Sequence, residues 1–289
     1  MKQHNYIQHP RTIRGLLAGA AVLALTGAAG APAPAAAERL VVPLSRPGQP
    51  ATFQAGGLNA TFTVEGYDGQ EVIVETDVAR DAEANGEGRE RQRERPAPPG
   101  MRRLPNPGFG LSVEEDGNVV ELHVQGFSDQ RIHVRVPRNT SVEVSSVNGG
   151  DIHVQGVNGT HEIGHVNGAI TARDVTGTVV AHTTNGDVKA TLSRIDAGKP
   201  MSFVSFNGNV DVTFPASFSA DLKMRSDQGE IFTDFDVEVK PAAPARREES
   251  TRGKFRISLE RSLEASIGGG GPEVSLRTFN GNIYVRKGR

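Results

Sequence analysis

The fold of this chain is decided by a repeat that reads VNGGDIHV at 147–154, VNGAITAR at 166–173 and TNGDVKAT at 184–191. The pattern returns as FNGNVDVT at 206–213, DQGEIFTD at 227–234 and FNGNIYVR at 279–286. An apolar residue follows most of the turns by three positions, at Ile170, Val179, Val188, Val210, Ile231 and Ile283. A second small or apolar residue comes two positions later, at Ala172, Ala181, Ala190, Val212 and Val285. Residues two apart in a strand point to the same side, so both residues of each pair predict one buried face.

Further turns at Asn158-Gly159 and Thr176-Gly177 divide the repeat, so that the chain turns every nine or ten residues. A strand this short cannot bury its apolar face alone, but a coil can stack each turn on the last at about 4.8 Å. Asn-Gly suits the corners, because glycine and then asparagine adopt a positive φ at low cost, and stacked asparagines can pair their amides in a ladder. We therefore predict an all-β fold, a β-solenoid with Asn-Gly corners. The alternative is a sandwich or meander of β-hairpins, which the same dipeptide also favours.

Composition limits the possible partners and the possible chemistry. The chain has 289 residues with 32 basic and 34 acidic side chains, and Lys2, Arg11 and Arg14 lie in the predicted leader. The acidic balance that remains argues against a nucleic-acid partner held by net charge. The chain has no cysteine and no tryptophan, which excludes disulfides and thiolate chemistry and argues against wide aromatic platforms.

Residues 1–37 resemble a secretory signal peptide. A basic start precedes the apolar run GLLAGAAVLALTGAA at 15–29, and Ala35-Ala36-Ala37 satisfies the small-x-small cleavage rule. The apolar run is shorter than the ~20 residues of a spanning helix, although an uncleaved anchor is the alternative. We expect an exported protein, periplasmic or extracellular, with no transmembrane segment in its mature chain.

The remaining chain divides into alternating β segments and inserts. Residues 38–80 predict N-terminal β-strands that serve as first rungs or as a cap, and 109–289 predict the repeat domain. Residues 81–108 combine dense mixed charge with prolines and glycines, which is typical of a disordered insert; a helical docking arm is the alternative. A smaller break at 240–253 predicts a loop insert within the repeat domain.

Several of these segments together resemble a bacterial family known as the putative adhesins. The segments are GYDGQEVIVE at 66–75, VPRNTSVEVSSVNGGDIHV at 136–154, the Asn-Gly repeats, and GGGPEVSLRTFNGNIYVRKG at 269–288. The resemblance implies an exported domain of β-strand repeats with an adhesin-like role, and it supplies no catalytic residues. The chain departs from the family pattern at Asn59-Ala60, Thr176-Gly177 and Gln228-Gly229.

His161-Glu162-Ile163-Gly164-His165 matches the zinc-protease pattern H-E-x-x-H, with Gly168 and Thr171 at the glycine and third-ligand positions of its longer form. That chemistry needs a helix, whereas Asn-Gly pairs bracket this segment and predict a strand. In a strand the two histidines lie about 13 Å apart, too far for one zinc ion with bonds of about 2.1 Å. We expect His161 to point inward and Glu162 outward, without a metal.

A row of outward carboxylates is the other candidate for chemistry. Asp187, Asn209 and Glu230 stand two residues past their corners, and Asp211 follows Lys189 on the next outward position. Stacked in sequence order, Asp187 and Glu230 would lie two rungs or about 9.6 Å apart, near the spacing of inverting glycosidases. A solvated face is the alternative for this row.

The remaining histidines, His123, His133, His153 and His182, lie at strand positions among polar residues and predict solvated side chains, and Gly268–Gly271 predicts a turn. The sequence therefore predicts no catalytic, cofactor-binding or metal-binding residue. We expect a non-enzymatic surface or periplasmic interaction module whose partner is an unknown protein or glycan. The alternative function is a β-helical carbohydrate-active enzyme, a polysaccharide hydrolase or lyase, that uses the outward carboxylates.

Overall fold

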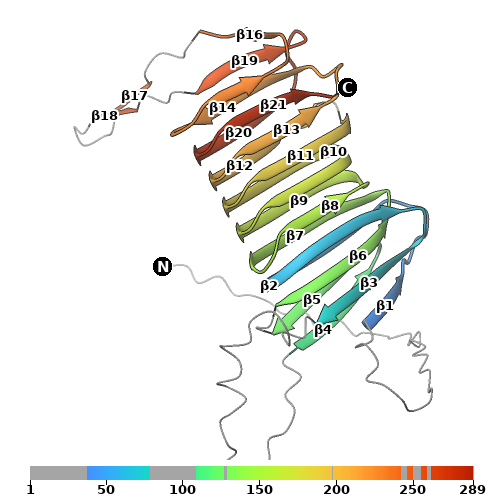
Figure 1. Ribbon diagram of the computed structural model, residues 1–289. Coiled ribbons are helices and arrows are strands. Elements are labelled where there is room, and N and C mark those ends of the chain that lie inside the picture. Colours follow the sequence, from blue (N-terminus) through green and yellow to red (C-terminus); the bar gives the residue numbers. More distant parts are fainter. Residues whose placement is uncertain are drawn as a thin grey trace, which may run out of the picture. The chain divides into compact units, whose positions relative to one another are not determined.

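The computed structural model describes residues 38–78, 109–126, 129–196, 198–241, 246–249, 255–258 and 262–288. Every regular element in these ranges is a β-strand, so the predicted all-β class is confirmed (Figure 1). The predicted leader at 1–37 and the charged insert at 81–108 lie outside the described residues. The described strands belong to one unit that spans Ala37–Arg289.

Most strands pair in two series, here called face I and face II. Face I runs in the order β4 (Phe109–Asp116), β5 (Val119–Gly126), the first part of β2 (Ala51–Tyr67), β7 (Thr140–Asn148), β9 (Asn158–Asn167), the second part of β10 (Ile170–Asn185), β12 (Met201–Asn207), β20 (Glu273–Asn280), β14 (Ala220–Ser226), β19 (Leu263–Ile267) and β16 (Val237–Val239). All pairs from β5 to β14 are parallel, and the pairs at both ends of the series are antiparallel.

Face II runs in the order β1 (Glu38–Pro43), β3 (Glu71–Val78), β6 (Gln130–Pro137), the second part of β2, β8 (Ile152–Gln155), the first part of β10, β11 (Val188–Ile195), β13 (Val210–Phe214), β21 (Ile283–Lys287) and β15 (Ile231–Thr233). The pairs from β6 to β15 are parallel. The pair β17 (Arg246–Glu249) and β18 (Phe255–Ser258) is a separate antiparallel ribbon that starts within the predicted loop insert at 240–253.

Parallel pairing on both faces follows from the corners. Three Asn-Gly corners are bonded to the corner of the next rung: the amides of Gly168, Gly186 and Gly208 donate to the carbonyl oxygens of Asn185, Asn207 and Asn280 at 2.8–2.9 Å. Gly186 has φ +146°, and an added Cβ would collide with the carbonyl oxygen of Gly168 in the rung beside it. Only glycine fits this position, because both the backbone conformation and the stacking distance exclude a side chain.

The predicted asparagine ladder is present. Side-chain amides donate from rung to rung at 2.7–2.8 Å, and the ladder consists of Asn148, Asn167, Asn185, Asn207 and Asn280. A second row of bonds, two residues past the corners, joins side-chain oxygens to the next backbone amide; Asp187 accepts from the Asn209 amide at 2.8 Å. The corners are thus held by side-chain as well as backbone bonds.

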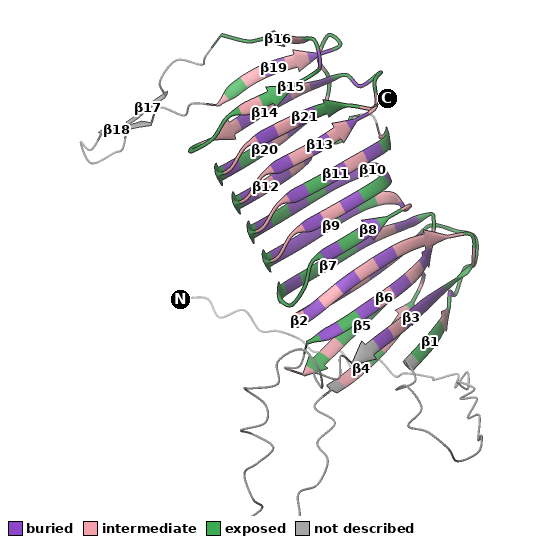
Figure 2. Ribbon diagram, in the orientation of Figure 1, coloured by how far each residue is buried: buried purple, intermediate pink, exposed green. Residues whose placement is uncertain are grey.

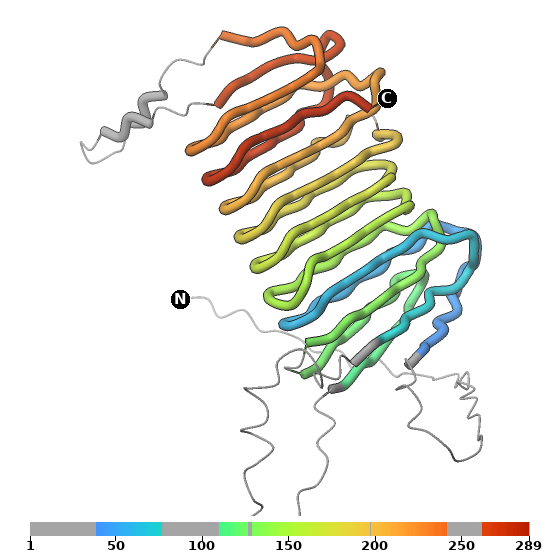
Figure 3. The backbone as a smooth tube through the Cα atoms, in the orientation of Figure 1, coloured from blue at the N-terminus to red at the C-terminus, as the bar shows by residue number. Residues whose placement is uncertain are grey.

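The rungs do not stack in sequence order, which corrects the expected arrangement. The last repeat, formed by β20 and β21, lies between the rung of β12 and β13 and the rung of β14 and β15. The rung at 227–234 is therefore one step further along the stack than sequence order predicts. At the other end β2 lies between β5–β6 and β7–β8, as its colour in Figure 3 shows. Both insertions bring together strands that are distant in the chain.

The core is one continuous column between the two faces (Figure 2). The predicted inward residues, from Ile170 and Ala172 through Ile283 and Val285, are buried, and Ile231 is partly buried against them. Its largest fully buried side chains are four phenylalanines, namely Phe53, Phe62, Phe203 and Phe214. Among the residues that the structure describes, no helix is long and apolar enough to cross a membrane.

Candidate functional site

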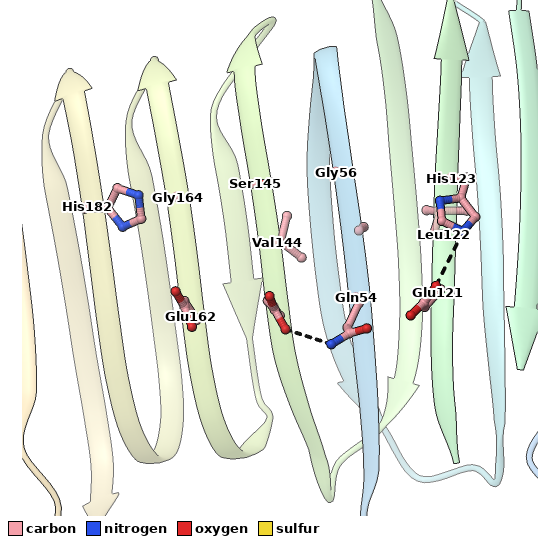
Figure 4. A pocket seen from close by; sticks show the side chains of 12 residues that line it. Gln54, Gly56, Glu121, Leu122, His123, Val144, Ser145, Glu162, Gly164 and His182 are labelled. Atoms are coloured by element: carbon pink, nitrogen blue, oxygen red, sulfur yellow. Dashed lines mark hydrogen bonds and ion pairs between the residues drawn. The ribbon is translucent and has the colours of Figure 1, made fainter. Parts of the chain in front are cut away.

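An open groove of about 480 Å³ crosses the outer side of face I over β5, β2, β7, β9 and β10. Figure 4 shows the side chains that form it, in rows that run across the strands. Because parallel strands in register place equivalent residues side by side at about 4.8 Å, each row is set by the strand pairing. Three rows determine the character of the groove.

The acidic row consists of Glu121, Gln54, Glu143 and Glu162, in that order across four neighbouring strands. Gln54 Nε2 donates to Glu143 Oε2 at 2.8 Å. Glu121 lies 3.5 Å from His123 Nε2. The row presents three carboxylates to solvent on one side of the groove, which favours a cationic or hydrogen-bond-donating partner.

The small row consists of Gly56, Ser145 and Gly164 and forms the bottom of the groove. His123 and His182 stand at its two ends (Figure 4). An added Cβ at Gly164 would approach the His182 ring to 2.9 Å, so the ring occupies the space above this glycine. The absence of side chains here creates the depression.

The apolar row, Leu58, Val147 and Val166, lies two residues further along the same strands. These side chains are 52%, 38% and 38% exposed, which is unusual for large aliphatic groups placed next to one another. The row borders the asparagine ladder. A ligand on face I thus meets acids on one side, a depression in the middle and aliphatic groups on the other side.

The protease-like motif lies entirely within strand β9, as predicted. His161 and His165 are both buried and Glu162 is exposed. His165 Nε2 lies 2.9 Å from the Gly150 carbonyl oxygen, and His161 Nε2 lies 3.2 Å from that of Thr176. Within the ranges that the structure describes, no group of three or more His, Cys, Asp or Glu residues could hold a metal ion.

The spacing expected for the carboxylate pair is wrong. Asp187 aligns with Asn209, Asn209 with Asn282, and Asn282 with Glu230, because the last repeat is inserted between them. Asp187 and Glu230 are therefore three steps or about 14 Å apart, beyond the ~6.5–9.5 Å of inverting glycosidases. Asp211 instead forms a bidentate pair with Arg286 at 2.7 and 3.0 Å, which raises the pKa of the arginine.

The other four histidines lie on the outer faces, and the predicted solvated position is confirmed for three of them. His123, His153 and His182 are exposed, whereas His133 is partly covered and lies 3.2 Å from Glu65 and 3.7 Å from Glu75. Gly268–Gly271 forms the turn between β19 and β20, and all four glycines have positive φ.

A row of buried or partly buried hydroxyls two residues before the corners was not predicted from the sequence. They donate to corner or strand-start carbonyls in the neighbouring rung at 2.7–2.9 Å, and the row consists of Ser146, Thr183, Ser205, Ser226 and Thr278. His165 takes the equivalent position in β9. The recurrence of Ser or Thr before x-Asn-Gly was the signal. The groove was missed as well, since glycine and serine at outward positions carry no chemistry of their own.

Comparison by structure finds two bacterial proteins that are described as a putative cell adhesion protein and a putative adhesin. A putative cell adhesion protein from Clostridium sporogenes aligns with 88% of this chain and 100% of its own, at 10% identity and a TM-score of 0.40. A putative adhesin from Bacteroides fragilis aligns with 88% of this chain and 98% of its own, at 13% identity and a TM-score of 0.36. Both carry the adhesin designation to which the sequence resemblance points. No protein-family model and no curated protein matches the chain.

Proposed function

We propose that this protein is an exported, non-enzymatic β-solenoid that acts as an adhesin-like interaction module, with the groove of face I as its recognition surface. Residues 1–37 are the secretory signal in this proposal, 38–80 supply the first rungs, and 109–289 form the repeat domain, with inserts at 81–108 and 240–253. The mature chain acts in the periplasm or at the cell surface, on a protein or glycan partner.

The solenoid assignment is supported by the parallel pairing of both faces and by the ladder that joins their corners. A coil whose rungs bond through backbone, asparagine and hydroxyl groups is a rigid support with outer side chains in fixed register. Preorganised rows of this kind reduce the entropy lost on binding, which suits a recognition surface.

The observation that carries the proposal is the groove itself. Its acidic and small rows form an open depression beside the apolar row, and the carboxylate pair that favoured a hydrolase is separated by three rungs. Open surfaces with mixed rows resemble protein interfaces, whereas catalytic pockets enclose their substrates and bring acid and base groups together.

Binding of the purified protein to arrays of glycans and bacterial envelope proteins tests the proposal. Ser145→Tyr fills the bottom of the groove, and Thr171→Tyr places the same side chain on the outer side of face II as a matched control. We expect Ser145→Tyr to reduce binding at least about tenfold, or about 1.4 kcal/mol, while Thr171→Tyr leaves it unchanged. Equal binding by both variants would contradict the groove as the recognition surface.

A further inference from the structure

The outer side of face I changes character on either side of β10. On β9, β7 and β2 the central row holds the small residues Gly164, Ser145 and Gly56. The same row on β12, β20 and β14 holds long or branched side chains, Val204, Arg277 and Arg225. The two halves of one surface thus differ in relief: the first is depressed, and the second projects.

The two rows beside the central row also differ between the halves, in charge and in the type of apolar side chain. The position of the acids Glu143 and Glu162 is taken by Ser275 and Ser202 in the second half, and Lys223 follows on β14. The apolar row continues as Phe206 and Phe279, which are 49% and 37% exposed and stack with ring centroids 4.9 Å apart. The first half carries acidic and aliphatic side chains, whereas the second half carries the basic side chains Lys223, Arg225 and Arg277, three carboxylates and two phenylalanines.

A two-fold axis between two copies of the chain can set one half of this surface opposite the other half. Face I has three strands on each side of β10, from β2 to β14. When the axis runs parallel to β10, each strand on one side faces a strand of the other side in the second copy, and each row faces the same row. Gly164 then faces Val204 of the second copy, and Ser145 faces its Arg277. Gly56 faces Arg225 of that copy, so the two arginines meet small residues, whereas Val204 meets Gly164 beside the His182 ring that covers it.

From this relation we infer that the partner of the groove is a second copy of this chain, docked face to face with its rungs in reverse order. The inference rests on the proposed function and names the occupant of the same surface. Arg277 of one copy enters the groove over Ser145, two residues from Glu143 of the other. An arginine and a carboxylate that meet in this way form a charge-assisted hydrogen bond.

The remaining charged groups fit the same docking. Glu273 and Asp221 accompany the basic residues, and the two-fold places them opposite Ser141 and Thr52, which are uncharged and can donate hydrogen bonds. Asp227 lies 2.7 Å from Arg225 within its own chain. The symmetry therefore brings no carboxylate of the second half directly opposite a carboxylate of the first half.

The apolar rows also meet. Val166 lies opposite Phe206 of the second copy and Val147 opposite Phe279, so exposed aliphatic and aromatic groups cover one another twice in each dimer. Seven strands at about 4.8 Å and about six residues of each strand give a flat area of roughly 30 by 20 Å. Side-chain relief raises this toward the ~800 Å² per partner of a standard interface.

Sedimentation equilibrium with charge-reversed variants tests the inference. We expect a dimer for the wild-type protein, and at least a tenfold weaker dimer for both Glu143→Arg and Arg277→Glu. An equimolar mixture of the two variants should form heterodimers as strong as the wild-type dimer, because each reversed charge meets its complement in the other chain. Lys189→Glu, on face II, is the control and should remain a dimer, and circular dichroism of each variant verifies that it is folded.

A wild-type protein that stays monomeric from about 1 to about 100 μM overturns the inference, as does a mixture that fails to form heterodimers. The array experiment separates this failure from that of the proposed function. If the wild-type protein is a monomer and Ser145→Tyr loses binding to the array, self-recognition is refuted and the groove is a site for another partner. A dimer that dissociates in Ser145→Tyr and binds nothing on the array supports self-recognition.

Discussion

Replacement of His161 by valine tests whether the H-E-x-x-H segment is a rung of the column. The His161 side chain is fully buried, and strand pairing places it between Val142 and Val179 of the neighbouring rungs. Its Nε2 faces the Thr176 carbonyl oxygen, whereas Nδ1 has no hydrogen-bond partner. Burial lowers the pKa of this histidine, and the nearby carbonyl oxygen only partly opposes that effect.

His161→Val makes several contributions to the free energy of unfolding, and these contributions oppose one another. It removes an unpaired buried nitrogen that costs about 1–3 kcal/mol, and it loses a hydrogen bond worth about 0.5–1.5 kcal/mol. The smaller side chain leaves unfilled space, at a further cost of about 0.5–1.5 kcal/mol. These contributions nearly cancel at pH 7.5, so we expect the free energy of unfolding to stay within about 1 kcal/mol of wild type.

At lower pH, His161→Val should become more stable relative to wild type. Because the pKa of His161 is lower in the folded chain than the ~6.5 of the unfolded chain, the unfolded state binds the proton first. Wild-type stability is therefore lost as the pH falls through about 6.5 toward the folded-state pKa, by up to about 1.4 kcal/mol for each unit between them. Valine cannot titrate, so His161→Val should lose less stability than wild type between pH 7.5 and pH 5.

Urea unfolding at both pH values measures this difference, with exposed His153→Val as the matched control. The reasoning is refuted if wild type and His161→Val show the same pH dependence. Elemental analysis of dialysed protein adds an independent measurement. One zinc ion per chain, lost in His161→Val together with stability, would favour a metalloprotease site instead of a rung.

Three further substitutions test the corners and the column by thermal or urea unfolding. Gly186→Val should destabilise by about 3 kcal/mol or more because of its positive φ and its backbone collision, whereas Gly198→Val, with φ +87° and open space around it, should cost only about 1–2 kcal/mol. Val188→Asp buries a charge and should lower the free energy of unfolding by more than about 4 kcal/mol, whereas Lys189→Ala, at an exposed position, should change it by less than about 0.5 kcal/mol. Equal effects of the two substitutions would contradict the inward position of Val188. Asn185→Ala interrupts the ladder and should cost about 1 kcal/mol, and no loss would mean that water replaces its amide bonds.

The inward column could be predicted from the sequence because burial imposes a strict period of two on each strand. Val188 and Ala190 are buried while Lys189 between them is exposed, and the same alternation holds from rung to rung. The corners could be predicted equally well, because Asn-Gly suits a tight corner with positive φ. Local rules of this kind act within a few residues, where sequence patterns are informative.

The order of the rungs could not be predicted, because it depends on which distant strand completes a free edge. The inward residues of the rungs are mostly apolar, so burial alone does not specify which rung stacks on which. One signal was present: Phe-Asn-Gly-Asn occurs at 206–209 and again at 279–282, and these two rungs are neighbours with their phenylalanines stacked. The error in the carboxylate spacing followed directly from the sequence-order assumption.

The two inserted segments link the stability of the stack to its proposed self-recognition. In a simple solenoid each rung contacts only its sequence neighbours, so the ends open independently of the middle. Here β2 pairs with β7 across 89 residues, as at Ala55 and Val144, and β13 pairs with β21 across 73 residues, as at Val210 and Ile283. The same segments carry Gly56 on the depressed half of face I and Arg277 on the projecting half. The strands inserted near each end of the stack therefore also carry part of each complementary half of face I.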